Sequence, residues 1–477
     1  MAVETTSDIA AAVSFARQNE LRLGIRGTGH DYLGRSRGSR SLLLWTHAMR
    51  DIEVHEAFVP YGAVTEGNDA AVPAVTVGAG THWLEVYQAL ALYGRFVVGG
   101  GCTSVGAAGG FVLGGGFSSF TKDYGSAAGN VLEFEVVTAD GGTLVANEQQ
   151  HPLLFWALRG GGGGTFGVVS KVTYRTYPMP RTITGAAGSI RASTDTDYRA
   201  LIRRVVRLFP DLIDLHWGET IRFGPDNSIE LGMAAVDLDD EAAGAVWRPL
   251  LDWVARRPEA YSSDAYVASG PFTRFWDAER WDEVAPQMIR HDDRPGRSRH
   301  FWWEANDDEV SWYVDAFASR WIPAGLFAES PDRLADVFFG MSRRWFFHTH
   351  ANKGLAGASE ELLQRERVTS LNPSAFEAAA LLIIGSTQPR AFPGVPEHEP
   401  DRQAAGARAR RVSEAMDLLR AITPGSGSYV NQADYFEDEW QHSFWGANYP
   451  KLLEAKATYD PDNVFRVHHG VGSERTN

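Results

Sequence analysis

The sequence predicts a two-domain α+β protein, and three observations support this. The chain has 477 residues, which is longer than one hydrophobic core usually serves. Residues 1–178 alternate helical and strand periodicity until Pro178 and Pro180 interrupt the pattern. Residues 179–410 show the pattern of an antiparallel sheet covered by helices, and residues 411–477 are expected to return to the first domain.

The elements of the first domain follow from its apolar periodicity. A helix capped by Ser7 or Asp8 precedes a strand at 21–25, where apolar and polar residues alternate. Further strands are expected at 74–80, 96–98 and 132–136, with a helix between Thr81 and Gly94.

The second domain shows a different texture. A helix is expected around 198–205, then a hairpin whose strands contain 221–223 and 229–231, then a helix over 246–254. The proline- and glycine-containing stretch 391–405 is typical of a surface loop. A last long helix is expected to begin at about residue 411.

Composition excludes several classes of function. The net charge is −15, which disfavours general binding to nucleic acid or to an anionic membrane. No apolar run approaches the roughly 20 residues that a membrane-spanning helix needs. The expected partners are therefore small molecules, and the chain is expected to act as a monomer or a homodimer.

Three absences favour an intracellular location. The single cysteine, Cys102, excludes an internal disulfide. The first residues lack the basic and apolar regions of a signal peptide, and no glycosylation sequon occurs.

Two glycine-rich turns carry the residues that indicate function. The first turn is Arg26-Gly27-Thr28-Gly29-His30-Asp31, and the second runs from Gly99 to Gly106 around Cys102. Glycine lets backbone N–H groups approach a ligand closely, as a pyrophosphate requires. A third run, 160–167, adjoins a strand, so flexible linkers are the weaker interpretation. A nicotinamide fingerprint is disfavoured, because only Gly78 and Gly80 of its glycines are present.

A histidine and a cysteine in such turns suit covalent attachment of a flavin. The 8-methyl group of the isoalloxazine ring is acidic and can react with a neutral imidazole, and ring position 6 can accept a thiolate. The N–H groups of the second turn are expected to help Cys102 form its thiolate.

Five motifs together resemble a known family. They are the His30 turn with Tyr32, the Cys102 turn with its following glycines, Asp123-Tyr124-Gly125 with Asn130, the run from Arg159 to Gly167, and Tyr459-Asp460-Pro461 with Asn463 and Phe465. Nearly the whole chain resembles the fungal-type, berberine-bridge-enzyme-like branch of the vanillyl-alcohol oxidase and p-cresol methylhydroxylase flavoproteins.

The resemblance implies a two-domain FAD-binding fold, with a PCMH-type FAD domain at 1–178 and a substrate domain of antiparallel sheet at 179–410. It also implies an 8α-N-histidyl bond to His30 and a 6-S-cysteinyl bond to Cys102. The other cofactor-binding residues that it implies are Arg26, Gly27, Thr28, Gly29, Asp31, Gly100, Gly101, Thr103, Val105, Gly106, Gly109, Gly110, Gly116, Gly164, Gly167, Val169, Asn463 and Phe465.

The activity implied is that of an oxidase. Hydride passes from an alcohol, or a similar C–H next to O or N, to flavin N5, and molecular oxygen is then reduced to hydrogen peroxide. The substrate class is a carbohydrate or a secondary metabolite. Gly100, two residues before Cys102, favours access of oxygen. The alternatives are an oxidative cyclase or dehydrogenase of a biosynthetic pathway and a flavin-binding protein without turnover.

At the catalytic base the sequence departs from the family motif. Many members of the family that this chain resembles carry Asn-Tyr-x-Asp near the C-terminus with the tyrosine as base, whereas this chain has Asn431-Gln432-Ala433-Asp434. The phenols that remain as candidates are Tyr429, Tyr435 and Tyr124.

The motif His348-x-His350-x-Asn352-Lys353 resembles one in the substrate domain of the fungal branch. In a strand its positions 348, 350 and 352 would share one face, where they could line the substrate cleft or serve structure alone. His350 and Asn352 are the substrate-binding candidates. No metal site is predicted, because a third ligand of suitable type is missing.

Overall fold

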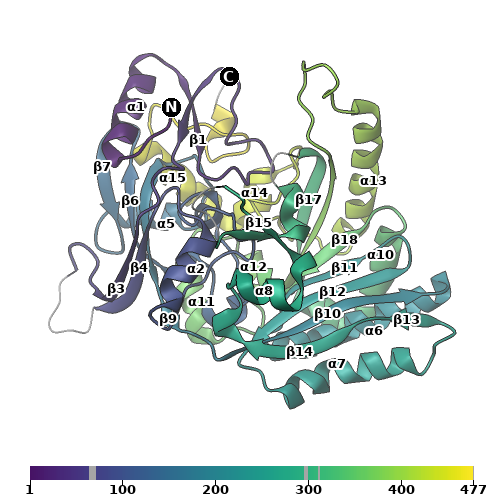
Figure 1. The fold of residues 1–477 in the computed structure, drawn as a ribbon. Coiled ribbons are helices and arrows are strands. Elements are labelled where there is room, and N and C mark those ends of the chain that lie inside the picture. The colour runs from purple at the N-terminus through teal and green to yellow at the C-terminus, as the bar shows by residue number, and fades with distance from the viewer. Residues whose placement is uncertain (64–70, 295–298, 310–311, 476–477) are drawn as a thin grey trace.

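The computed structural model describes residues 1–63, 71–294, 299–309 and 312–475. Two domains lie side by side (Figure 1). The N-terminal and C-terminal parts of the chain form the first domain, and the middle of the chain forms the second. Within these ranges no helix combines the length and the apolar character that a membrane-spanning segment requires.

The first domain is built on a five-stranded antiparallel sheet. Its strand order is β3-β4-β8-β6-β7, and a separate parallel pair, β1 and β2, lies beside it. The strands are β1 (Arg22–Arg26), β2 (Ser41–Trp45), β3 (Ile52–Phe58), β4 (Val72–Gly78), β5 (Arg95–Phe96), β6 (Val131–Val137), β7 (Thr143–Ala146), β8 (Val168–Arg175) and β9 (Tyr177–Pro178), and the helices are α1 (Thr6–Gln18), α2 (Trp83–Ala91), α3 (Gly110–Leu113), α4 (Thr121–Tyr124) and α5 (Pro152–Leu158).

The cap of α1 differs from the expected one. Thr5 is the capping residue, not Ser7 or Asp8. The backbone N–H of Asp8 donates to Thr5 Oγ1 over 3.2 Å, and the Asp8 carboxylate accepts from the N–H of Thr5 over 3.0 Å. This reciprocal pair satisfies two donors that the helix leaves open, so it outcompetes a cap further along the chain.

The second domain contains an eight-stranded antiparallel sheet. Its order is β13-β10-β12-β11-β18-β19-β17, and β14 also pairs with β10. The strands are β10 (Thr182–Ala192), β11 (Gly218–Phe223), β12 (Ser228–Val236), β13 (Tyr261–Ser263), β14 (Tyr266–Pro271), β17 (Tyr313–Pro323), β18 (Phe347–His350) and β19 (Ala378–Gln388), with a separate hairpin of β15 (Ile289–His291) and β16 (Phe301–Trp303). The predicted hairpin is confirmed as β11 and β12, in which Ile221 faces Leu231.

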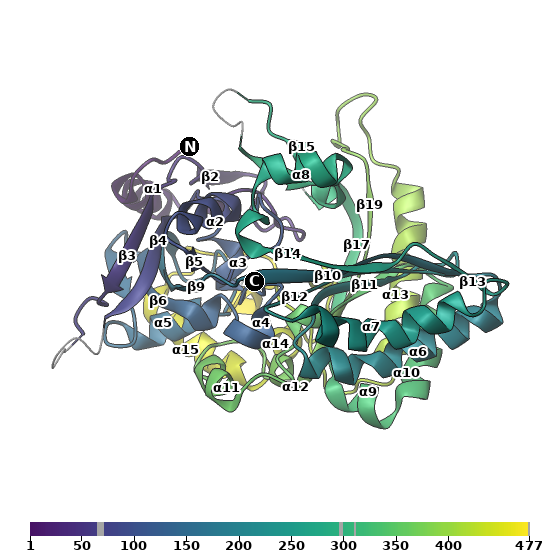
Figure 2. The same ribbon diagram turned by 60° about the horizontal axis from the view of Figure 1, so that its bottom comes forward.

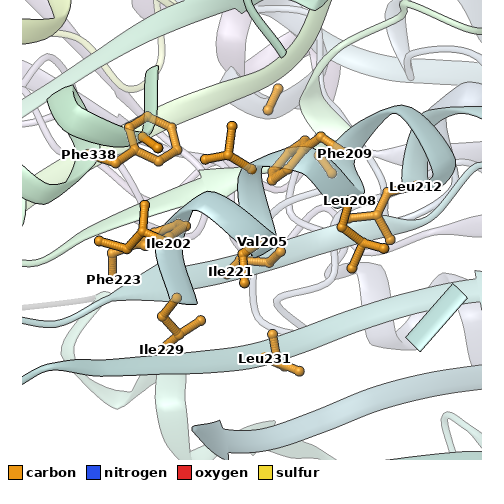
Figure 3. Close-up of a cluster of buried hydrophobic side chains, with 14 of the residues drawn as sticks. Ile202, Val205, Leu208, Phe209, Leu212, Ile221, Phe223, Ile229, Leu231 and Phe338 are labelled. Carbon is orange, nitrogen blue, oxygen red and sulfur yellow. The ribbon is translucent and has the colours of Figure 1, made fainter. Parts of the chain in front are cut away.

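Helices cover one face of this sheet (Figure 2). The predicted apolar helix is confirmed as α6, and its buried face packs on the strands through Ile202, Val205 and Phe209 (Figure 3). The helices of this domain are α6 (Asp195–Asp214), α7 (Asp240–Ala255), α8 (Ala278–Val284), α9 (Ala324–Glu329), α10 (Pro331–Ser342), α11 (Glu360–Arg367), α12 (Ser374–Glu377) and α13 (Arg402–Arg420). The opposite face of the sheet is directed towards the first domain.

The C-terminal boundary differs from the expected one. Helix α13 begins at Arg402, inside the predicted loop, because Asp401 caps it. Its buried residues Val412, Met416 and Leu419 join the core of the second domain, so residue 411 does not start the returning segment. The chain returns later, and α14 (Trp440–Trp445) and α15 (Tyr449–Tyr459) pack into the first domain.

Candidate active site

A cavity of about 720 Å³ lies between the two domains. The turn after β1, the turn after β5 and the glycine run before β8 form its wall on the first domain. Strands β11, β18 and β19 form the opposite wall, and residues 429–432 close one side. The face of the second sheet that helices do not cover therefore lines the cavity opposite the glycine turns of the first domain.

His30 and Cys102 converge on one part of this cavity. Ser104 Oγ lies 2.9 Å from His30 Nε2 and 3.7 Å from Cys102 Sγ, so one hydroxyl touches both side chains. A ring nitrogen of His30, the sulfur of Cys102 and a carboxylate oxygen of Glu309 all lie within 4.8 Å of one another. Nδ1 of His30 is buried and lies 3.5 Å from a Glu309 oxygen, with no hydrogen-bond partner among the described residues.

Glycine gives the first wall its shape. Gly29 has φ +97° and Gly164 has φ +71°, a backbone conformation that L side chains rarely adopt. The wall consequently presents main chain instead of side chains over much of its length. A long cavity lined by glycine N–H groups fits a dinucleotide such as FAD, whose pyrophosphate accepts hydrogen bonds from such groups.

The structure brings most of the predicted cofactor-binding residues to the cavity. Those on its wall are Gly27, Thr28, Gly29, His30, Asp31, Gly100, Gly101, Cys102, Val105, Gly106, Gly109, Gly110, Gly164, Gly167 and Val169. Five others lie off the wall: Arg26, Thr103, Gly116, Asn463 and Phe465.

Two of the five residues off the wall, Thr103 and Phe465, make hydrogen bonds to neighbouring segments. Thr103 Oγ1 donates to the carbonyl of Phe301 over 2.6 Å, which ties the Cys102 turn to the second domain. The N–H of Phe465 donates to Asp460 over 2.9 Å. Such residues hold the wall in place without touching the cavity.

The environment of the Cys102 thiol differs from the expected one. Burial, and then the neighbouring Glu309 carboxylate, hold the pKa of this thiol well above its usual range. The backbone N–H of Ser104 lowers the pKa of this thiol, as expected, but burial outweighs it, so the chain by itself favours the thiol.

Of the three candidate phenols, the structure places Tyr429 on the cavity wall. Its hydroxyl oxygen accepts from the N–H of Gly116 over 3.2 Å and from Nδ2 of Asn431 over 3.1 Å, and burial raises the pKa of Tyr429 to about 12. Tyr435 is exposed and stacks on His468. Tyr124 packs against aromatic rings away from the cavity.

The motif around His350 reaches the cavity. His348, His350 and Asn352 all line it, together with Lys353 from the short 3₁₀ turn η6 (Ala351–Lys353). Lys353 Nζ lies 3.2 Å from His350 Nδ1, and Oδ1 of Asn352 is buried with no partner in the described part of the chain. Burial lowers the pKa of His348 to about 4 and holds that of His350 well below its usual range, so both imidazoles are neutral at pH 7.

Two acidic residues on the wall, Glu219 and Glu309, carry no local sequence pattern. Glu219, Glu309 and Trp303 come from separate segments, and the fold alone brings them to the Cys102 turn, where Trp303 Nε1 donates to the carbonyl of Gly101 over 2.9 Å. Lys353, by contrast, is the last residue of the motif that begins at His348.

The buried imidazole of His348 predicts a pH-dependent stability. Its folded pKa of about 4 lies below the ordinary 6.5, so the unfolded chain binds this proton more readily between these values. Stability is therefore expected to fall as the pH drops from 6.5 towards 4, with roughly 3 kcal/mol of the loss due to His348. Urea unfolding at pH 7 and pH 4.5 should show a smaller loss for His348→Gln than for the wild type, and an equal loss would contradict the assignment.

Two family models match the ends of the chain. The model described as FAD binding domain matches residues 1–147, and the model described as berberine and berberine like matches residues 428–472. The FAD-linked oxidoreductase ZEB1 of Gibberella zeae is 33% identical over 483 residues, which covers 99% of this chain and 76% of that protein. The VAO-type flavoprotein oxidase VAO615 of Thermothelomyces thermophilus is 32% identical over 479 residues, covering 99% of this chain and 75% of its own length.

Solved structures share the fold. The VAO-type flavoprotein MtVAO615 from Myceliophthora thermophila superposes with a TM-score of 0.80 at 29% identity, covering 99% of this chain and 79% of that one. Glucooligosaccharide oxidase from Acremonium strictum, described with a 6-S-cysteinyl, 8α-N1-histidyl FAD, superposes with a TM-score of 0.69 at 20% identity, covering 99% and 91%. The FAD-type cavity, the two family models and the relatives agree, and this chain belongs to the berberine-bridge-enzyme-like FAD-linked oxidoreductases of the vanillyl-alcohol oxidase superfamily.

Proposed function

We propose that this chain is an oxidase whose FAD is held by two covalent bonds, 8α to His30 and 6-S to Cys102. The observation that carries the proposal is the meeting of this imidazole and this thiol, within 4.8 Å of one another, on a cavity lined with glycine. Glucooligosaccharide oxidase, which shares the fold, carries its FAD in that manner.

The hydrogen bonds of His30 favour one of its two nitrogens for attachment. Nε2 is engaged with Ser104 Oγ at 2.9 Å, whereas the buried Nδ1 has no hydrogen-bond partner among the described residues. Forming the bond to carbon costs less free energy at a nitrogen that has no hydrogen bond to lose. The linkage is therefore proposed at Nδ1, which is the N1 position of the ring.

FAD, when bound, accepts two electrons from a substrate carbon and delivers them to O₂, giving H₂O₂. The chain contributes two kinds of surface for the substrate. Aromatic side chains, including Trp276, Trp303 and Phe346, offer flat apolar contact, while neutral His350 and Asn352 offer hydrogen bonds. This combination suits an alcohol, or a similar C–H beside O or N, of a carbohydrate or a secondary metabolite.

Peroxide yield tests the proposed reaction. The enzyme should be incubated in air with gluco- and chito-oligosaccharides and with aromatic and polycyclic alcohols, and O₂ uptake and H₂O₂ should be measured together. One H₂O₂ for each O₂ consumed supports the oxidase. Flavin bleaching without peroxide would favour a dehydrogenase or an oxidative cyclase, and a flavin that no compound bleaches would favour a binding protein.

Gly100 is expected to control access of oxygen. It lines the cavity two residues before Cys102, and a Cβ there would lie 3.1 Å from Phe111 and 3.3 Å from Trp83. The larger side chain of Gly100→Val should therefore block the approach of O₂ to the flavin. We expect oxidation of the dithionite-reduced flavin by aerated buffer to slow by about 10-fold or more, which raises the barrier by about 1.4 kcal/mol. Stopped-flow measurement of flavin reoxidation at equal flavin content tests this prediction, and an unchanged rate would contradict it.

A further inference from the structure

Glu219 is held in a strained backbone conformation on the cavity wall. It is the second residue of β11 and has φ +66°, which is uncommon for any residue with a side chain and unusual within a strand. Such strain persists only where the surroundings enforce it, and it concentrates at functional sites. The position therefore merits a functional explanation.

The packing around Glu219 shows what the strain achieves. The preceding residue, Gly218, lies so close to the first domain that a Cβ would come within 1.8 Å of the carbonyl oxygen of Ser119. The start of β11 is thus pressed against that loop, and the hydroxyl of Ser119 donates to the Glu219 carboxylate. A Cβ built on Gly101 would lie 3.4 Å from Glu219 Oε1, so this carboxylate is beside the residue that precedes Cys102.

This placement matters if the flavin is attached as proposed above, and the inference rests on that attachment. In the isoalloxazine ring, C6 and N5 are separated by a single ring-fusion carbon, so N5 is the next position beyond that carbon along the same edge. A ring bonded to Cys102 through C6 consequently presents its reacting edge near the Cys102 turn. Glu219 contacts this turn at Gly101. The other carboxylate on the wall, Glu309, lies 3.5 Å from His30 Nδ1, at the proposed 8α attachment and not at the N5 edge of the ring.

The other candidates for the proton acceptor are less suitable. Gln432, where relatives have the phenol, carries an amide that does not act as a base. The Tyr429 hydroxyl is buried and accepts two hydrogen bonds, from Gly116 and Asn431. Nδ1 of His350 lies 3.2 Å from Nζ of Lys353, so this nitrogen already has a hydrogen-bond partner.

The charged groups that face Glu219 come from three elements. Lys353 of η6 interacts with both Glu219 and Glu309, the latter from the 3₁₀ turn η5 (Glu304–Glu309), and the buried phenol of Tyr87 in α2 also lies within electrostatic range of Glu219. Burial lowers the pKa of Lys353, and the two carboxylates oppose that shift, so the lysine and the carboxylates favour each other's charged forms. A negative carboxylate can thus be kept on the wall beside the reacting edge.

We propose that Glu219 is the catalytic base of this enzyme, in place of the phenol that Gln432 replaces. The substrate O–H or N–H bond breaks and its proton passes to the carboxylate of Glu219. The adjacent C–H bond breaks, its hydrogen and electron pair pass to the bound flavin, and a C=O or C=N bond forms. O₂ then takes the electron pair and hydrogen from the flavin and the proton from Glu219, leaves as H₂O₂, and the carboxylate is restored.

Sulfite binding tests the placement of the charge without a known substrate. Sulfite adds to flavin N5 and brings negative charge there, so a nearby carboxylate opposes it. Glu219→Gln in the holoenzyme is expected to tighten the sulfite Kd by about 10-fold, since an adjacent like charge is removed. Glu230→Gln is the matched control, because Glu230 lies on the next strand, off the cavity wall, and pairs with Arg222. Equal Kd values for Glu219→Gln and the wild type would overturn the inference.

Flavin reduction tests the role of the base. With a compound that bleaches the wild type anaerobically, Glu219→Gln should reduce its flavin at least about 100-fold more slowly, as expected for loss of a general base, and Glu219→Asp should recover part of the rate. Glu219→Gly keeps a positive φ without strain and should melt no lower than the wild type, which separates loss of the base from misfolding. An unchanged reduction rate would overturn the role. Covalent flavin content, measured after acid precipitation, reports separately on the proposed attachment.

Discussion

Replacement of both His30 and Cys102 by alanine is expected to give a chain that releases all of its flavin on acid precipitation. The wild type should leave a yellow pellet, because denaturation breaks the contacts of the cavity wall but not covalent bonds. Each single variant, His30→Ala or Cys102→Ala, should also keep its colour, because one bond remains. Ser104→Ala is the matched control: it removes the hydroxyl that touches both side chains but leaves both bonding atoms.

The outcome separates two explanations of the yellow colour. If the double variant still retains its pigment after denaturation, some other residue carries the bond. If the wild type releases its pigment, the flavin is held by the glycine wall alone. The fold itself should survive, because both side chains lie on the cavity wall and not in a core, and far-ultraviolet circular dichroism checks this.

The second large effect is expected at Lys456, which fastens the C-terminal segment to the first domain. Its ammonium group is buried, pairs with Asp460 at 2.5 Å and donates to the carbonyls of Thr165 and Phe465 over 2.8 and 2.6 Å. Lys456→Met leaves the Asp460 carboxylate buried without its cation. The expected loss in the free energy of unfolding is about 3–5 kcal/mol.

Urea unfolding measures this loss, and two further variants interpret it. Lys451 lies on the same helix as Lys456, is exposed, and contacts the ring of Trp156. Lys451→Met should lower the free energy of unfolding by less than about 1 kcal/mol. Lys456→Met combined with Asp460→Asn should be more stable than the sum of the single losses predicts, because the unpaired charge is gone. A loss for Lys456→Met no larger than for Lys451→Met would contradict the account.

The sequence allowed the regular elements to be predicted where one apolar period dominates. Helix α6 and the β11–β12 hairpin both have a buried face that repeats along the segment, and both are confirmed. The start of α13 was placed wrongly, because alanine and arginine from Arg402 onwards form a helix with few apolar residues, and the Asp401 cap decides its start. Its packing on the second domain depends on the surface that β17 and α10 offer, which no local pattern reveals.

The candidate site was predictable on one wall only. The His30 and Cys102 turns are local motifs, so sequence alone indicates their glycines and their two reactive side chains. Glu219 and Glu309 belong to the other domain and reach the same place through packing, and each occurs in a segment with no distinguishing neighbours. The backbone strain at Glu219 is also invisible in the sequence, since glutamate is not a residue that suggests a positive φ.

Peptide mapping of the wild-type enzyme tests the central claim most directly. Trypsin cuts after Arg26, Arg35, Arg95 and Lys122, so His30 and Cys102 fall in the separate peptides 27–35 and 96–122. Mass spectrometry is predicted to find these two peptides joined in a single species through one FAD. Recovery of both peptides at their unmodified masses would contradict the bicovalent attachment.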